Sequence, residues 1–111
     1  MATERRKSQR HEVKSLIALT SKGVAQVANL SIKDICIKFT NTVHFPDYSV
    51  IDLYDANGLN MEEVVTKKVW SKTFDNQSGY KLFRSKIVAE LENLSPAQEY
   101  QLRFYLRQLE K

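Results

Sequence analysis

Two short groups of polar residues in this sequence could together bind a phosphorylated ligand. Residues 6–10 read RKSQR, with two arginines four positions apart, and residues 29–34 read NLSIKD. Arginine forks bind phosphate oxygens in pairs and stack on purine rings. Asparagine and serine side chains can hydrogen-bond the edge of a base. The combination predicts a site for a small anionic nucleotide, enclosed where an N-terminal arm folds over a strand end.

Neither group is specific by itself, because the chain contains a second copy of each. Arg103 and Arg107 repeat the arginine spacing on an expected solvated helix face. Asn-Leu-Ser recurs at residues 93–95, where Ser95 is expected to cap a helix. The combination becomes informative through its order along the chain. The arginines precede the first expected strand, and the Asn-x-Ser group follows the second.

Catalytic signatures do not occur in the sequence. His11 and His44 lie far from Cys36 and share no metal-ligand spacing with it. The chain has three glycines, too few for a glycine-rich phosphate loop. Cys36 is expected to be a small strand residue with no redox role. The sequence therefore predicts a binding protein and not an enzyme, with no catalytic residue, metal site or cofactor.

Composition indicates an ordinary globular protein with a mild preference for anionic partners. The 111 residues carry a net charge of +4, and the excess is concentrated in residues 4–14. A single cysteine favours a reducing compartment. No apolar segment follows the basic N-terminus, and none is long enough to span a membrane. We therefore expect a cytoplasmic protein without membrane insertion.

Short β-like runs separated by turn signals occupy most of the chain. Strands are expected over residues 13–19, 24–30, 35–39, 49–54, 63–72 and 80–91. This spacing predicts a closed antiparallel β-barrel over residues 13–92, within one domain that covers 1–111. Residues 1–12 lack apolar periodicity, and we expect them to form a flexible basic arm.

The chain changes character after the barrel. Ser95 is a favourable helix N-cap, Pro96 suits the first helical position, and Gln98 completes a capping box. Apolar side chains then recur at helical spacing, at Leu102, Tyr105, Leu106 and Leu109. These signals predict a C-terminal helix over residues 95–109.

This order of motifs resembles the PilZ domain family, bacterial receptors for the second messenger cyclic di-GMP. The resemblance covers nearly the whole chain and implies a mainly β, split-barrel type fold of six antiparallel strands with a C-terminal α-helix. The matching positions are Arg6 and Arg10 in the family's R-x-x-x-R, Asn29 and Ser31 in its D/N-x-S-x-x-G, Val69-Trp70 late in the barrel, and the helix start at 95–106.

The resemblance also implies roles for the matching residues. In the family the arginines hold the phosphates and stack on guanine, while the Asp/Asn and Ser contact guanine from the opposite side. The family is a binding module, so a downstream protein partner is expected as well. The implied ligand-binding residues are Arg5, Arg6, Arg10, Asn29, Ser31 and Asp34. Alanine at Asn29 or Ser31 is then expected to weaken ligand binding with little effect on stability.

Asp34 departs from the family pattern, which has glycine at this position. Glycine permits a positive φ, and aspartate is among the few residues that tolerate one. The Asp34 carboxylate would lie near the expected phosphates, where Lys33 could offset its charge. Replacement of Asp34 by glycine is therefore expected to tighten binding.

Two other functions fit the same sequence. One is a module of this fold that has lost the nucleotide and works through a protein partner. The other is a small nucleic-acid binder, since small barrels with basic arms bind single strands. Nucleic acid is the less favoured partner, because the expected strands show no interleaved basic and aromatic face.

Overall fold

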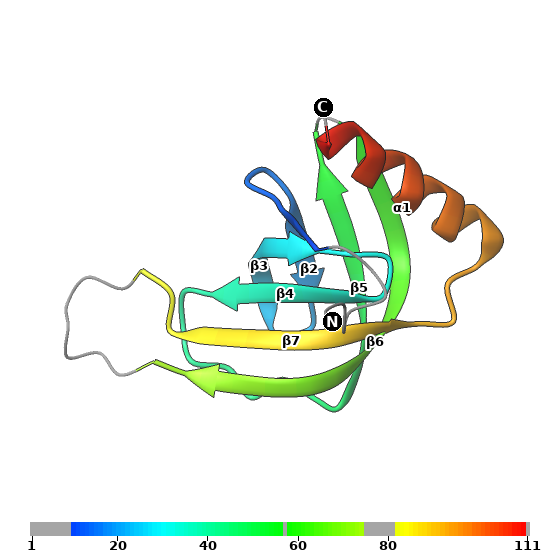
Figure 1. Ribbon diagram of the computed structural model, residues 1–111. Coiled ribbons are helices and arrows are strands. Elements are labelled where there is room, and N and C mark those ends of the chain that lie inside the picture. Colours follow the sequence, from blue (N-terminus) through cyan, green and yellow to red (C-terminus); the bar gives the residue numbers. More distant parts are fainter. Residues whose placement is uncertain (1–9, 57, 75–81, 111) are drawn as a thin grey trace, which may run out of the picture.

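The computed structural model describes residues 10–56, 58–74 and 82–110. These residues form seven strands and one helix (Figure 1). The elements are β1 (His11–Glu12), β2 (Ile17–Thr20), β3 (Gly23–Leu30), β4 (Asp34–Phe39), β5 (Tyr48–Asp55), β6 (Leu59–Thr73), β7 (Ser85–Glu92) and α1 (Pro96–Leu109).

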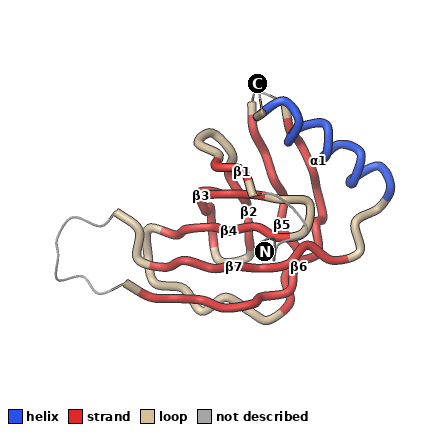
Figure 2. Tube along the Cα trace, in the orientation of Figure 1, coloured by secondary structure: helices blue, strands red, loops and turns tan. Residues whose placement is uncertain are grey.

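Six of the strands close into an antiparallel barrel. Their order is β3-β2-β5-β6-β7-β4, and a pairing between β3 and β4 completes the ring. The short β1 is an additional strand that pairs with the end of β3 (Figure 2). The barrel and the C-terminal helix confirm the predicted fold class.

The first strands begin at different places from those predicted. His11 and Glu12 were expected in the flexible arm, but they pair with Leu30 and Asn29 of β3. The strand has only two residues, and its pairing depends on backbone groups. A sequence pattern of alternating apolar residues therefore could not predict it. The run predicted over 13–19 is regular only from Ile17, because Val13 and Leu16 turn into the core. The chain thus enters the barrel along the end of β3, beside the predicted binding motif.

The barrel interior is filled by the alternating apolar residues of its strands. On β4, Ile35, Ile37 and Phe39 point inward and are almost completely buried, as the alternation predicted. Cys36 and Lys38 therefore lie on the outer face of the same strand. This assignment of inner and outer faces decides which side chains can meet a ligand.

Helix α1 packs on the barrel through Leu102, Tyr105 and Leu106. Its start has the predicted capping box, in which Ser95 Oγ accepts from the Gln98 backbone N–H and Gln98 Oε1 accepts from the Ser95 N–H. Within the described part of the chain, no helix is long and apolar enough to cross a membrane.

A buried carboxylate connects the helix to the barrel. Asp55, at the end of β5, is only 4% exposed. Its Oδ2 accepts hydrogen bonds from the Tyr105 hydroxyl at 2.6 Å and from Ser15 Oγ at 2.9 Å. Burial raises the pKa of the Tyr105 phenol, and the neighbouring carboxylate raises it further. The phenol is therefore held protonated as a donor to Asp55.

Candidate functional site

The turn between β3 and β4 is organised around the Ser31 hydroxyl. Ser31 is 1% exposed, and its Oγ accepts hydrogen bonds from the backbone N–H groups of Lys33 at 3.0 Å and Asp34 at 2.9 Å. The Ser31 N–H in turn donates to the Asp34 carbonyl at 2.9 Å. Serine commonly shapes turns through such local bonds. In this structure Ser31 holds the turn that presents Asp34.

The Asp34 backbone does not need the glycine of the family motif. Asp34 is the first residue of β4, and the positive φ angles among described non-glycine residues belong to Glu63 and Asn93. Aspartate is therefore accommodated at this position without backbone strain. Its effect on the site comes from its carboxylate alone.

That carboxylate binds Arg10, the N-terminal arginine that the structure describes. Arg10 Nε donates to Asp34 Oδ1 and Arg10 Nη2 to Oδ2, both at 3.2 Å. Ser31 Oγ also donates to Asp34 Oδ1 at 2.9 Å and so orients the carboxylate. The ion pair is partly buried, with side-chain exposures of 33% for Arg10 and 22% for Asp34. The hydrogen bonds that Ser31 and Arg10 donate to Asp34 thus hold the Arg10 guanidinium on the outside of the barrel.

Asn29 lies on the same outer surface of the barrel as this hydrogen-bonded group. It pairs with Glu12 of β1 on one side and with Cys36 of β4 on the other. The β3–β4 register shifts between Val27 and Asn29, so that the inward alternation is interrupted just before Asn29. Its side-chain amide makes no hydrogen bond to another described residue. The amide is therefore available to a ligand.

The surface between these residues and β7 has a small apolar floor. Cys36 and Val88 face each other across β4 and β7 and are 3% and 6% exposed, although they lie outside the barrel core. Burial raises the pKa of the Cys36 thiol, an effect that the nearby Lys86, Lys38 and Arg10 oppose. Burial therefore favours the protonated form of this thiol.

Of the six residues implied by the resemblance, the structure describes four. Arg10, Asn29, Ser31 and Asp34 meet at the corner formed by β1, β3 and β4. Arg5 and Arg6 lie outside the described residues, as does most of the expected arm. The Asp34 carboxylate, expected to lie beside ligand phosphates, is instead occupied by Arg10.

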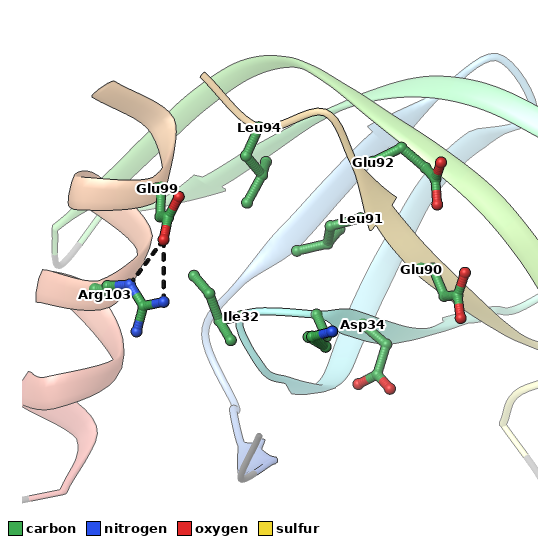
Figure 3. Close-up of a pocket in the computed structure, with 9 residues that line it drawn as sticks. Ile32, Asp34, Glu90, Leu91, Glu92, Leu94, Glu99 and Arg103 are labelled. Carbon is green, nitrogen blue, oxygen red and sulfur yellow. Dashed lines mark hydrogen bonds and ion pairs between the residues drawn. The ribbon is translucent and has the colours of Figure 1, made fainter. Parts of the chain in front are cut away.

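A cavity of about 420 Å³ opens beside this turn, between the end of β7 and α1 (Figure 3). Its lining includes Ile32, Leu91 and Leu94, which Figure 3 shows between the helix and the strands. Its charged lining is Lys33, Asp34, Glu90, Glu92, Glu99 and Arg103, and Glu99 is paired with Arg103 at 3.0 Å. Carboxylates outnumber basic groups here. The excess of negative charge makes the cavity unfavourable for a phosphate group.

The burial of Ser31 changes the effect expected from its removal. Ser31→Ala leaves the N–H groups of Lys33 and Asp34 without their acceptor, and we expect it to lower the free energy of unfolding by about 1–2 kcal/mol. The sequence had indicated a surface position and almost no loss. Urea denaturation measures the effect. Asn29→Ala is the matched control, expected to cost less than about 0.5 kcal/mol. Equal losses in the two variants would contradict a special role for the Ser31 hydroxyl.

Comparison with known proteins supports the fold. No family model matches the chain, and no curated protein matches it in sequence. A solved structure of the Bacillus subtilis inhibitor of motility, MotI/DgrA, is similar, with a TM-score of 0.62 at 15% sequence identity. The match covers 97% of this chain and 53% of the other, so this chain spans about half the length of that protein. The architecture is therefore that of the expected PilZ-like barrel.

Proposed function

We propose that this protein is a non-catalytic signalling receptor or adaptor that binds cyclic di-GMP on the outer surface of its barrel. The observation that carries the proposal is the position of Arg10. Its guanidinium is held by Asp34 at the corner of β1, β3 and β4, and Asn29 belongs to the end of β3 at the same corner. An arginine and an asparagine thus meet on one surface, as recognition of a phosphate and a base edge requires.

Arg10 keeps donors for a ligand in spite of its ion pair. A guanidinium has five N–H donors, and the contacts with Asp34 use its Nε and Nη2 edge. The remaining donors would bind a phosphate, with Arg6 as the second arginine of the motif. Asn29 would bind a guanine edge. Ser31 acts here as a positioning residue, because its hydroxyl is committed to the turn and to Asp34.

The same ion pair favours a second candidate function, that of a module which works through a protein partner without the nucleotide. The Asp34 carboxylate provides Arg10 with an anion from within the chain, at the place where a phosphate would bind. A regulatory role also fits the name of the structural neighbour, an inhibitor of motility. In this case Arg10 and Asp34 would serve only to fasten the arm to the barrel.

Calorimetric titration separates the two functions. Cyclic di-GMP should bind saturably, whereas cyclic di-AMP, which has the same phosphate ring but no guanine edge, should bind much more weakly. GTP serves as a second control, with guanine but no cyclic diphosphate. Absence of heat with cyclic di-GMP, in a protein that unfolds cooperatively, would contradict receptor function and favour the module without nucleotide.

The carboxylate of Asp34 is expected to compete with ligand phosphates for Arg10. Asp34→Asn keeps an oxygen for the Ser31 hydroxyl but removes the charge, and should tighten cyclic di-GMP binding by about 0.5–1 kcal/mol. The gain should shrink as salt rises, since screening shortens the reach of the charge. Glu90→Gln, which removes a carboxylate from the neighbouring strand, should give a smaller gain. Weaker binding by Asp34→Asn would show that the carboxylate is needed to position Arg10.

A further inference from the structure

Three lysines stand side by side on the outer face of β4, β7 and β6. Lys38 is directly opposite Lys86, and Lys86 is directly opposite Lys72. Adjacent strands are about 4.8 Å apart, so the three side chains originate within about 10 Å of one another. We call Lys38, Lys86 and Lys72 the lysine row. Figure 2 shows the three strands lying next to each other.

The lysine row is unfavourable for the barrel itself. Like charges at directly opposed positions destabilise a sheet. No ion pair within the described part of the chain includes any of the three lysines. The residue opposite Lys38 on its other side, Gln26 of β3, is neutral. A stable barrel would favour alternating charges at these positions, so the row indicates an external anion.

Each lysine of the row lies over an aromatic ring. The Nζ atoms are 5.5 Å from the Phe83 ring centroid for Lys38, 5.8 Å from that of Trp70 for Lys86, and 5.5 Å from that of Phe74 for Lys72. The Trp70 side chain is also solvent-accessible, at 43% exposure. Trp70 lies opposite Val88, beside the apolar floor formed with Cys36. Positive charge and aromatic surface are therefore interleaved over a single face.

This arrangement corrects one expectation from the sequence. Nucleic acid was the less favoured partner because the expected strands showed no interleaved basic and aromatic face. In the structure the alternation runs across β4, β7 and β6, which come from separate parts of the chain. Phe74 and Phe83 contribute from just beyond the strands, next to Thr73 and near Ser85. The argument against nucleic acid is therefore wrong for this face.

We propose that the face formed by the lysine row with Trp70, Phe74 and Phe83 binds single-stranded nucleic acid. The lysines would turn from the rings to successive phosphates, and a base would stack on the Trp70 face that Lys86 leaves, the combination by which proteins hold single strands. A membrane fits less well, because membrane-binding side chains project apolar groups beyond the charges. Here the ammonium groups lie over the rings.

The site is distinct from the corner proposed for cyclic di-GMP. Lys38 is near the end of β4, whereas Asp34, which holds Arg10, is its first residue. Asp34 is directly opposite Glu90, and Glu90 is directly opposite Lys67. The residues beside Asp34 therefore do not extend the positive surface. The two proposed sites therefore use different charged residues. Arg10→Ala should lower the oligonucleotide affinity less than replacement of the three lysines does.

Fluorescence anisotropy of the full chain with a labelled uridine oligonucleotide of about twelve nucleotides tests the proposal. Changing all three lysines of the row to glutamine should lower affinity about tenfold and reduce the slope of log K against log salt by roughly two. The matched control is the triple glutamine variant of Lys14, Lys22 and Lys33, exposed lysines outside the row. It removes the same charge and should lower affinity less than about threefold. Equal losses in the two variants would overturn the assignment.

Trp70 is the only tryptophan of the chain, so its fluorescence reports directly on the face. The oligonucleotide should quench it, whereas inorganic polyphosphate, which has no bases, should not. Equal responses would reduce the face to a general anion site and overturn the proposal. Sedimentation with anionic phospholipid vesicles that is lost in the lysine-row variant, without oligonucleotide binding, would assign the face to membranes instead.

Discussion

Arg10→Ala is expected to weaken cyclic di-GMP binding by about 1.5–3 kcal/mol, the usual contribution of a charge-assisted hydrogen bond. Arg10 is the described arginine of the motif, and its two contacts with Asp34 hold it against the barrel. Its fork is already oriented before a ligand arrives, so little side-chain entropy remains to be lost on binding. Calorimetry with wild-type and variant protein gives the change directly.

The alanine variant also frees the Asp34 carboxylate, which would itself repel a phosphate. The double variant Arg10→Ala with Asp34→Asn separates the two effects, since it removes the fork and the exposed charge together. Arg10→Lys keeps the charge without the bidentate geometry, and we expect it to recover only part of the affinity. If the double variant bound as well as wild type, the loss in Arg10→Ala would come from repulsion alone.

Arg103→Ala is the control for diffuse charge. Arg103 belongs to the other R-x-x-x-R spacing, on the solvated face of α1, where it pairs with Glu99. Its removal changes the net charge as Arg10→Ala does, but it should leave affinity unchanged. Equal effects at the two arginines would mean that general electrostatic attraction, and not the corner of β1, β3 and β4, binds the ligand.

Local signals in the sequence predicted the elements that local interactions determine. The alternation of Ile35, Ile37 and Phe39 identified the inner face of β4, because a strand exposes every second side chain to the core. Ser95 and Gln98 identified the start of α1, because the capping box is closed within four residues. Both predictions depend only on neighbours along the chain.

Contacts between distant segments could not be predicted in this way. Arg10 and Asp34 meet only because β1 pairs with the end of β3, and that pairing uses backbone groups with no sequence signature. Lys38 and Lys86 become neighbours through the β4–β7 register, which a one-residue shift would change. The motif therefore located the candidate site, but the partner of Arg10 and the lysine row required the three-dimensional structure.

The other large effect is expected at the contact between helix and barrel. Tyr105→Phe should lower the free energy of unfolding by about 1.5–3 kcal/mol, because it removes a 2.6 Å hydrogen bond to the buried Asp55 carboxylate. Ser15 still donates to the same oxygen, so the carboxylate keeps a partner. Tyr100→Phe is the matched control, since Tyr100 is on the same helix but 73% exposed. Urea denaturation near neutral pH compares the two variants.

The pH dependence of this difference tests its cause. The pKa of Tyr105 is raised in the folded protein by burial and by Asp55, whereas an unfolded tyrosine titrates near a pKa of about 10. The folded state thus binds the phenolic proton more tightly, and this contribution to stability is complete below about pH 10. Above that pH the unfolded chain loses the proton first, and the contribution declines. The stability gap between wild type and Tyr105→Phe should therefore be constant from neutral pH to about pH 9 and narrow at higher pH. A gap that stayed constant through alkaline pH, or an equal loss in Tyr100→Phe, would mean that packing, and not the bond to Asp55, sets the effect.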